Sequence, residues 1–391
     1  MTTASARVVP PPLVPPAPTL APEELDRYSR HILLPEIGGT GQRRLKNARV
    51  LVIGAGGLGS PVLLYLAAAG VGTVGIVDDD RVEASNLQRQ IVHGVGDVGR
   101  LKVDSARDAL AALNPLVEVR THPVRLSSEN AVTMFEQYDL VIDGADNFAT
   151  RYLVSDAAAV TGKPCVWGSI LRFGAQVSVF WNTCGPTYRD LYPDVPPPES
   201  APSCGEAGVL GVLCGVAGSM MAGEAIKLIT GTGRPLLGRL AVFDLAEATW
   251  RELRIQPDSD RPPIAEVRHQ GDPCGLSIPA TDAPDIITVE QLRTSLFERS
   301  SGQAAFELLD VREADEHARA HISGSRSVPL TRLRSDGPGR LGVPSELPII
   351  VYCAAGPRAR AAAMLLSAAG HRDVRVLAGG FDRWTALSGR P

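Results

Sequence analysis

Two short segments of this 391-residue chain combine residue types that could bind phosphate and carry sulfur. The first is the glycine-rich run GAGGLG at 54–59, whose backbone N–H groups could surround phosphate oxygens. The second is CAAGPR at 353–358, where one cysteine is followed closely by an arginine. Thiolate is the nucleophilic form of cysteine, and nearby positive charge stabilises it. The sequence therefore predicts a nucleotide site and a separate thiol site.

Charged side chains follow the glycine run at points that suit a triphosphate. Asp78 ends the next apolar strand, where a ribose hydroxyl is held in either a dinucleotide or an ATP site. Arg89 and Lys102 supply the positive charge that nucleotidyl transfer needs. Asp146 follows a third strand and is a candidate Mg²⁺ ligand. These residues favour nucleotidyl transfer, while an NAD(P)-dependent oxidoreductase and a turn that binds no ligand are the alternatives.

The loop at Cys353 comes directly after an apolar strand and before an Ala-rich helix. Backbone N–H groups and the helix N-terminus would lower the pKa of this thiol. Gly356 permits a tight curve, Pro357 suits a first helical position, and Arg358 adds a cation. The loop could thus carry a persulfide. A phosphatase-like anion site and a docking domain without catalysis are the alternatives.

Both segments lie in patterns typical of α/β domains. Strands are expected at 49–54, 71–78, 117–121, 139–146, 174–181 and 239–245, with helices at 101–113, 150–160 and 208–230 and one directly after the glycine run. The order of strand, glycine turn, helix and strand predicts a Rossmann-like, doubly wound α/β sheet. A second, smaller α/β set is expected from residue 286, with helices at 289–297 and 358–370 and strands at 305–312, 347–353 and 373–377.

Composition divides the chain into four parts. The Pro-rich residues 1–22 are predicted to form a disordered arm, and residues 23–256 form the larger domain. The stretch 257–285 is rich in Pro, Asp, Ser and Gly, which is typical of a linker. Residues 286–391 suffice for one small domain.

The overall composition limits the classes of binding partner and the cellular compartment that we expect. A net charge of −4 gives no indication of a nucleic-acid or membrane partner. The six cysteines form no C-x-x-C pair, which suits a reducing compartment. The apolar stretch 207–223 falls short of a membrane span and predicts a buried helix. We therefore expect a cytoplasmic protein.

Several motifs between residues 27 and 230 occur in one characteristic order. They are RYSR at 27–30, GAGGLGSP at 54–61, DDD at 78–80, SNLQRQ at 85–90, GRLKVDSA at 99–106, DGADN at 143–147, SCGEAGVLG at 203–211 and GEAIKL at 223–228. This order resembles the MoeB/ThiF group, which is related to ubiquitin-activating enzymes. The resemblance implies ATP- and Mg²⁺-dependent adenylation of the C-terminal glycine of a ubiquitin-like sulfur carrier of the MoaD/ThiS type, which ends in Gly-Gly.

The resemblance also implies roles for individual residues. The nucleotide would contact Gly54, Gly56, Gly57, Asp78, Asp80, Ser85, Asn86, Leu87, Gln88, Arg89, Lys102, Asp146 and Asn147. Arg89 and Lys102 would act on the phosphates, Asp146 would hold Mg²⁺, and Arg30 would reach across from the other subunit of a homodimer. Cys204 matches a position that in some relatives bonds covalently to the activated carrier. Direct sulfur delivery to the adenylate, with Cys204 dispensable, is the alternative.

The chain departs from this family at a metal site. Family members usually carry two C-x-x-C pairs that hold a structural zinc. Here 187–190 reads TYRD and 271–274 reads GDPC, so one of the four thiolates is present. A tetrahedral structural site needs four ligands, and we expect no structural zinc.

The segment 286–391 carries a second set of motifs. The loop C-x-x-G-x-R at 353–358 comes with LDVRE at 309–313, HISG at 321–324 and LAGGF at 377–381. Together they resemble the rhodanese family. The resemblance implies a persulfide on Cys353, beside Arg358, taken from a donor such as thiosulfate or a desulfurase persulfide.

The fusion of the two domains resembles the MoeZ-type arrangement. It implies an adenylyltransferase and sulfurtransferase that converts the carrier into a thiocarboxylate, for molybdopterin biosynthesis or another pathway that uses this chemistry. An oxidoreductase with a sulfur-relay domain and a non-catalytic sulfur-carrier adaptor are the alternatives.

Overall fold

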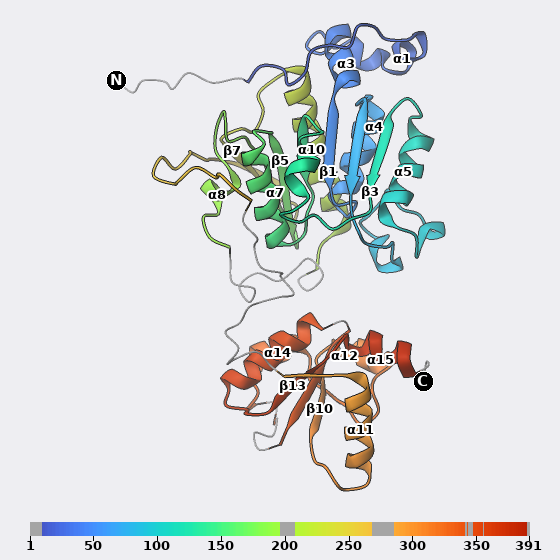
Figure 1. Ribbon diagram of the computed structural model, residues 1–391, viewed down its shortest axis with the longest axis vertical. Coiled ribbons are helices and arrows are strands. Elements are labelled where there is room, and N and C mark those ends of the chain that lie inside the picture. Colours follow the sequence, from blue (N-terminus) through green and yellow to red (C-terminus); the bar gives the residue numbers. More distant parts are fainter. Residues whose placement is uncertain are drawn as a thin grey trace. The chain divides into compact units, whose positions relative to one another are not determined.

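The computed structural model describes residues 10–195, 208–267, 285–340, 342, 347–354 and 356–388 (Figure 1). The chain divides into two compact units, Met1–Gly275 and Leu276–Pro391. Each unit has its own sheet and its own hydrophobic core. This confirms the predicted fold class, a doubly wound α/β domain with a smaller α/β domain.

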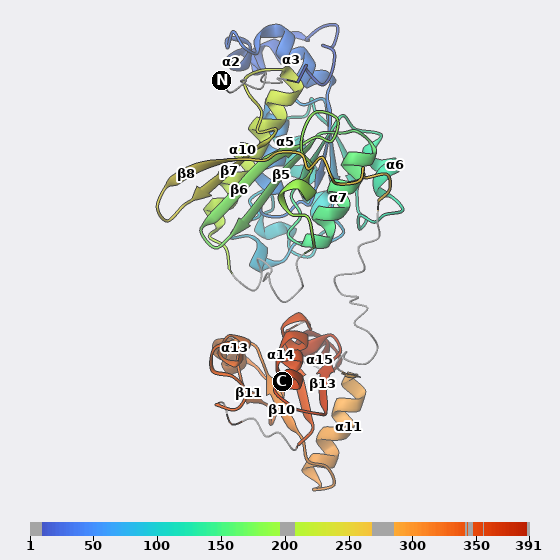
Figure 2. The same ribbon diagram turned by 90° about the vertical axis from the view of Figure 1, so that its left-hand side faces the viewer.

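An eight-stranded sheet in the order β3-β2-β1-β4-β5-β6-β7-β8 forms the centre of the N-terminal unit. Its strands are β1 Arg49–Ile53, β2 Thr73–Val77, β3 Glu118–His122, β4 Leu140–Asp143, β5 Cys165–Leu171, β6 Gly174–Phe180, β7 Arg239–Asp244 and β8 Thr249–Arg254. Strands β1 to β5 are parallel, and β5 to β8 continue as an antiparallel meander (Figure 2). Chain order reverses on the two sides of β1, and open α/β sheets bind ligands at such a point.

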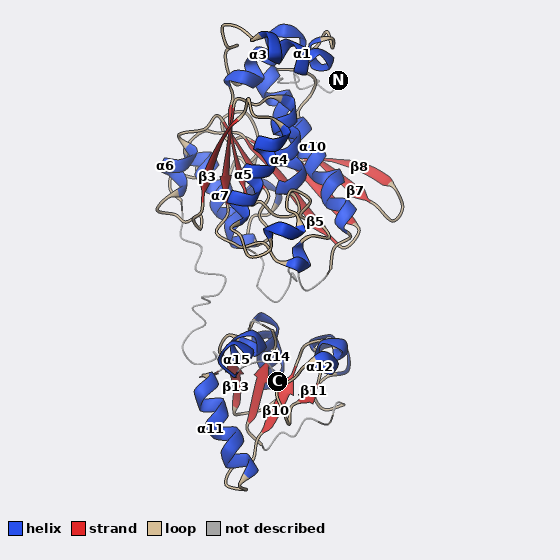
Figure 3. Ribbon diagram, turned by 90° about the vertical axis from the view of Figure 1, so that its right-hand side faces the viewer, coloured by secondary structure: helices blue, strands red, loops and turns tan. Residues whose placement is uncertain are grey.

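Helices cover this sheet on both faces (Figure 3). They are α1 Pro22–Arg27, α2 Ser29–Ile32, α3 Gly38–Asn47, α4 Gly59–Ala69, α5 Lys102–Leu113, α6 Ala131–Phe135, α7 Phe148–Val160, α8 Tyr188–Leu191 and α10 Gly211–Thr230. In β1, Val50 and Val52 join one core with α4, α5 and α10, while Leu51 and Ile53 join another with α6 and α7. Because successive side chains of a strand point to opposite faces, an all-apolar strand such as β1 must be covered twice.

Helix α10 is long and apolar enough to cross a membrane, with a mean hydropathy of 1.5 over its best window. Its residues Leu213, Ala217 and Met221 are instead buried in the core that α4 and α5 share. Side chains of a core helix face protein on more than one side, which accounts for its apolar composition. Helix α10 therefore lies where the sequence predicted a buried helix.

The segment before α1 differs from the expected disordered arm. Leu13 N donates to the Leu228 carbonyl at 3.1 Å, and Ala17 N donates to the Arg43 carbonyl at 2.9 Å. Val14 and Ala17 are each only 7% exposed. Residues 10–21 therefore lie along α3 and α10, because the apolar side chains between the prolines pack against the N-terminal unit. Residues 1–9 lie outside the described part.

The smaller unit contains a five-stranded parallel sheet in the order β11-β10-β12-β13-β9. The strands are β9 Asp285–Ile287, β10 Glu307–Asp310, β11 Arg326–Ser327, β12 Ile349–Tyr352 and β13 Val374–Leu377. The helices are α11 Val289–Ser300, α12 Ala314–Arg319, α13 Leu330–Asp336, α14 Pro357–Ala368 and α15 Gly380–Ser388. Central strand β12 leads directly into the loop at Cys353.

Candidate functional site

The glycine run forms the turn between β1 and α4, at the point where chain order reverses. Gly54 has φ +89°, a conformation that side chains disfavour. A Cβ on Gly59 would stand 1.9 Å from the Gly54 carbonyl oxygen. Both glycines are therefore required for the turn, which brings backbone N–H groups to the carboxyl edge of the sheet.

A cavity of about 470 Å³ opens at this edge. It is lined by predicted residues from five segments: Gly54, Gly56, Gly57, Asp78, Asp80, Arg89, Lys102, Asp146 and Asn147. Such a volume lies within the range of small-molecule and cofactor sites. The structure therefore brings together the glycine turn, both predicted cations and the predicted metal ligand.

Lys102 is the more buried of the two cations. Its side chain is 8% exposed, and Nζ lies 2.8 Å from an oxygen of Asp80, whose own side chain is 69% exposed. Asp78 accepts hydrogen bonds from the backbone N–H groups of Ala55 and Asp80 at 2.8 and 2.9 Å. Burial raises the pKa of Asp78, while Lys102 opposes the rise. The oxygens of Asp78, Asp79 and Asp80 lie within 4.8 Å of one another, so Lys102 stabilises a crowded acidic group.

Residues 85–88 do not line this cavity in the described structure. They form the turn that carries Arg89: Asn86 accepts from Glu83 N at 3.2 Å, and Arg89 Nη1 donates to the Ser85 carbonyl at 3.2 Å. Leu87 is half-buried, and Gln88 lies against Gly211 at the start of α10. Ser85, Asn86, Leu87 and Gln88 thus support Arg89 rather than face the cavity.

Arg30 is exposed on α2 and does not line the cavity of its own chain. Helix α2 precedes the amino end of β1, whereas the glycine turn follows the carboxyl end. The described chain therefore does not bring Arg30 to the other predicted residues.

Asp146 and Asn147 lie in the loop between β4 and α7. Asn147 caps α7, since its Oδ1 accepts from Thr150 N at 2.9 Å. Asp146 lines the cavity and its side chain is exposed. It directly precedes Asn147, which caps the start of α7. An exposed carboxylate beside bound phosphates is the oxygen donor that Mg²⁺ prefers. The residues present therefore fit Mg²⁺ through Asp146.

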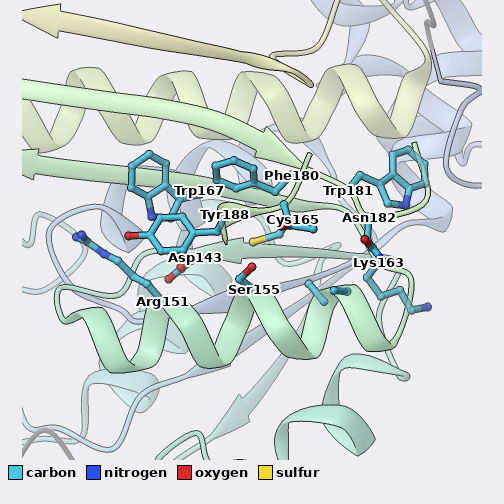
Figure 4. A pocket seen from close by; sticks show the side chains of 13 residues that line it. Asp143, Arg151, Ser155, Lys163, Cys165, Trp167, Phe180, Trp181, Asn182 and Tyr188 are labelled. Atoms are coloured by element: carbon cyan, nitrogen blue, oxygen red, sulfur yellow. The ribbon is translucent and has the colours of Figure 1, made fainter. Parts of the chain in front are cut away.

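A second, much smaller pocket of about 10 Å³ lies behind this loop (Figure 4). It is lined by Asp143, Arg151, Cys165, Trp167 and Tyr188, among others, and is too small for a nucleotide. Asp143 is 1% exposed, and burial raises its pKa to about 6. Burial also raises the pKa of Cys165, which therefore behaves as a small buried hydrophobe. This aromatic pocket supports the loop that carries Asp146.

His93 is a site residue that the sequence analysis missed. It is 7% exposed, with Nε2 2.9 Å from the Ala55 carbonyl oxygen and Nδ1 2.8 Å from Ser105 Oγ. Because a carbonyl only accepts, Nε2 carries the proton and Nδ1 accepts from the hydroxyl. Burial lowers the pKa of His93, so the ring is neutral. His93 therefore joins the glycine turn to α5, which carries Lys102.

Gln90 was also missed. It lines the cavity and is 5% exposed, and its Oε1 has no hydrogen-bond partner within the described residues. A buried amide oxygen at a cavity wall is available to a ligand donor. Spacing could have indicated it, since Gln90 directly follows Arg89 in the matched motif.

Where the family carries zinc ligands, this chain has ion pairs. Arg189 donates two hydrogen bonds to Asp156 at 2.8 and 2.9 Å, and Arg261 pairs with Asp190. Asp258 N also donates to Asp190, at 2.6 Å. The side chains at 187–190 therefore do not fit a zinc site. Residues 257–261, expected to form a linker, lie against the N-terminal unit. Cys204, Cys274 and residues 268–284 lie outside the described residues.

The loop after β12 holds Cys353 in the smaller unit. Gly356 N donates to Cys353 Sγ at 3.1 Å, and Gly356 has φ +126°, which permits the curve. Cys353 is only 1% exposed, so the residue is buried. Arg358, in the first turn of α14, donates to Glu316 at 2.6 and 3.0 Å. The predicted pair of thiol and cation is present, but a carboxylate holds the cation.

The other motifs of this unit support the loop. Phe381 N and Asp382 N donate to the carbonyls of Cys353 and Ala354 at 2.8 and 3.0 Å. A Cβ on Gly380 would stand 2.4 Å from the Cys353 carbonyl oxygen, so glycine is required there. Asp310 binds Arg312 through four hydrogen bonds, and these outweigh the effect of burial and lower the pKa of Asp310. The backbone of Cys353 and Ala354 is therefore held by the start of α15.

Comparison with protein families gives two matches. A model described as the ThiF family matches residues 28–263, and one described as a rhodanese-like domain matches residues 292–387. These ranges correspond to the two units and confirm both resemblances.

Curated relatives extend over the whole chain. "Probable adenylyltransferase/sulfurtransferase MoeZ" of Mycobacterium tuberculosis is 51% identical over 383 residues, which cover 96% of each chain. "Adenylyltransferase and sulfurtransferase MOCS3" of Culex quinquefasciatus is 40% identical and covers 93% of this chain and 87% of its own. "Sulfur carrier protein adenylyltransferase" of Thermus thermophilus is 55% identical and covers 60% of this chain and 88% of its own.

A solved structure supports the fold of the N-terminal unit. The crystal structure of E. coli MccB with ATP aligns with a TM-score of 0.55 and 20% identity. It covers 61% of this chain and 75% of its own. At this identity the likeness concerns the fold alone.

Proposed function

Because the chain belongs to the ThiF family and continues into a rhodanese-like domain, we propose that it activates a ubiquitin-like sulfur carrier and gives it sulfur. It is an adenylyltransferase and sulfurtransferase, as are the named relatives that match nearly its whole length. Arg89 and Lys102 around one cavity suit a triphosphate, and no observation favours the oxidoreductase alternative.

The first step takes place in the cavity of the N-terminal unit. The C-terminal carboxylate of the carrier attacks the α-phosphate of ATP, pyrophosphate leaves with the bonding electron pair, and an acyl-adenylate forms. Arg89 and Lys102 offset the charge that collects on phosphoryl oxygens. Asp78 receives the ribose, and the N–H groups of the glycine turn receive phosphate oxygens. No protein nucleophile is needed.

Two further groups complete this site in our proposal. Mg²⁺ bound at Asp146 would neutralise phosphate charge. Arg30 would come from a second copy of the chain, since it lies away from its own cavity. We therefore propose a homodimer.

The second step uses Cys353. Its thiolate takes a sulfane sulfur from a donor and becomes a persulfide. The outer sulfur then attacks the acyl carbonyl of the adenylate, AMP leaves, and an acyl disulfide forms. A second thiol attacks the Cys353 sulfur of that disulfide, the thiocarboxylate leaves with the bonding pair, and the disulfide that remains on Cys353 is reduced by an external thiol. Cys204 is the candidate for a covalent bond to the activated carrier, and it is dispensable if the sulfur is delivered directly to the adenylate. This chemistry needs a stabilised sulfur anion, which the loop N–H of Gly356 supports.

Two expectations remain proposals about the whole protein. We propose that no structural zinc is bound, because 187–190 offers no thiolate and its charged side chains are used in ion pairs. We propose a cytoplasmic location, because the described cysteines Cys165, Cys184, Cys214 and Cys353 form no disulfide with one another.

The observation that carries this proposal is that one cavity is lined by the glycine turn, Arg89, Lys102 and Asp146. The test is intact-mass analysis of Gly-Gly-terminated carriers after incubation with the protein, Mg-ATP and a sulfur donor. We expect a mass gain that corresponds to replacement of one oxygen by sulfur. A carrier with a C-terminal amide is the control. Unchanged mass for every carrier of this type, with ATP hydrolysis intact, would contradict the proposal.

A further inference from the structure

The cation of the sulfur loop is already bound to an anion of its own unit. Arg358 Nη1 and Nη2 lie 2.6 and 3.0 Å from the two carboxylate oxygens of Glu316. Two parallel hydrogen bonds of this kind are the strongest arrangement between these two side chains. Arg358 therefore does not offer an unshared positive charge to a ligand at Cys353.

Glu316 is held in this position from its other side. Its Oε2 also accepts a hydrogen bond from Glu313 N at 2.9 Å, which caps the start of α12. The side chains of Arg358 and Glu316 are 24% and 27% exposed, so solvent screens the pair only partly. Arg358 lowers the pKa of Glu316, which keeps the carboxylate ionised at neutral pH.

The charges of Arg358 and Glu316 therefore offset each other before any donor arrives. Thiosulfate brings two negative charges, and it must either displace Glu316 from Arg358 or approach an uncompensated carboxylate. A persulfide brings at most one negative charge to the same place. Coulomb repulsion from Glu316 scales with the charge on the donor, so the dianion is repelled about twice as strongly.

We propose that Glu316 is a specificity-determining residue, which lowers the reactivity of Cys353 toward dianionic donors and so favours a persulfide as the source of sulfur. The proposal rests on the sulfurtransferase role of Cys353. It goes beyond that role because it names the charge class of the donor and the residue that selects it.

The reaction is the same for either donor, which isolates the effect of charge. The Cys353 thiolate attacks the sulfane sulfur, the new S–S bond forms, and the old S–S bond breaks. With thiosulfate, sulfite leaves with the bonding pair. With methanethiosulfonate, a monoanion that carries the same reacting sulfur, methanesulfinate leaves instead. With a persulfide the leaving group is a thiolate.

The experiment compares thiosulfate and methanethiosulfonate as donors to the full chain, with cyanide as acceptor and ionic strength held constant. Glu316→Gln removes the charge, and its amide oxygen can still accept from Glu313 N. We expect kcat/KM for thiosulfate to rise about fivefold. This rise corresponds to about 1 kcal/mol in the activation free energy, which is the size of effect that a partly exposed ion pair gives. For methanethiosulfonate we expect about a twofold rise, because the donor carries half the charge.

Asp315→Asn is the matched control. It removes the same charge from the adjacent position of α12, where Asp315 pairs with Arg319 and is 71% exposed. We expect it to leave both donors within experimental error of the parent protein. An equal effect of both variants would overturn the proposal, because the general field would then be responsible.

Two other outcomes would also overturn the proposal that Glu316 selects the donor. No change in the ratio of the two donors with Glu316→Gln would overturn the proposal. A loss of transfer from both donors would do so as well, since Glu316 would then only hold the loop. A different result would contradict the sulfurtransferase role of Cys353 itself. In that case Cys353→Ser would retain sulfur transfer from both donors.

Discussion

The two sites differ in how many parts of the chain build them. The cavity of about 470 Å³ in the N-terminal unit takes side chains and backbone from eight segments, and Asp146 and Asp80 are exposed in it. The site of the smaller unit is one loop around a cysteine that is 1% exposed. In both, a carboxylate already holds a cation: Asp80 holds Lys102, and Glu316 holds Arg358. The partner of Lys102 is largely exposed, whereas Glu316 is also tied to its own helix start.

This difference follows from what each site handles. A nucleotide with three phosphates presents many oxygens, so its site needs donors from many directions. Transfer of a single sulfur atom needs one nucleophile in one stabilising loop.

Replacement of the cysteine should give the largest effect. We expect Cys353→Ala to abolish sulfur transfer to cyanide and to the carrier, a loss of about 10⁴-fold or more, as for removal of a catalytic nucleophile. ATP–pyrophosphate exchange should be unchanged, since the sulfur loop takes no part in adenylation. Loss of both activities would break the separation of the two sites.

Removal of a cation from the cavity should give the reverse result with a smaller factor. We expect Arg89→Ala to lower carrier-dependent ATP–pyrophosphate exchange by about 10²- to 10³-fold, as for loss of one group that stabilises a charged transition state. Thiosulfate:cyanide transfer by the same preparation is the internal control. Arg81→Ala is a matched variant, because Arg81 is exposed and donates to the Gly99 carbonyl, outside the cavity lining.

The buried carboxylate behind the cavity should make the stability of the N-terminal unit depend on pH. Burial raises the pKa of Asp143 to about 6 in the folded state, so that state binds the proton more tightly than the unfolded chain. Wild type should therefore lose stability relative to Asp143→Asn as pH rises from 4.5 to 7.5, by about 2 kcal/mol. Urea unfolding of both proteins at pH 4.5 and 7.5 measures this. An unchanged difference between the two pH values would contradict it.

The support of the glycine turn should give the smallest effect. His93→Leu leaves the buried Ala55 carbonyl and Ser105 hydroxyl without their partner, which costs about 1–3 kcal/mol in the free energy of unfolding. We expect weaker ATP binding, measured by calorimetry, with sulfur transfer to cyanide unaffected. Equal loss in both activities would show that the two units are not independent.

The sequence allowed most of the N-terminal fold to be predicted, because the signal is local. The apolar run 50–53 indicates a strand buried on both faces, and a glycine turn before an Ala- and Leu-rich helix is typical of the βαβ unit. Edge elements escaped prediction: β8 is exposed along its whole length, so it shows no burial pattern, and β11 has two residues. The expected arm was wrong for residues 10–21, because prolines exclude regular structure but not packing.

Individual site residues could be predicted where the residue type by itself indicates the chemistry. Arg89, Lys102 and Asp146 have charges that suit phosphate and metal, and the structure places them around one cavity. The role of His93 could not be derived, because it depends on contacts with residues 38 positions earlier and 12 positions later. The same holds for Glu316, which is 42 positions from Arg358 and lies between the motifs at 309–313 and 321–324.

The depth of Cys353 limits what can touch it. Burial of Cys353 to 1% exposure excludes a bulky electrophile more strongly than a terminal sulfur that projects from its carrier by one bond of about 2 Å. Once that atom has been handed over, it becomes the outermost part of the enzyme's own side chain, again one bond farther out. The transferred sulfur is therefore both accepted and donated as the terminal atom of a persulfide. A partner that binds before Cys353 carries this sulfur meets no reactive sulfur atom.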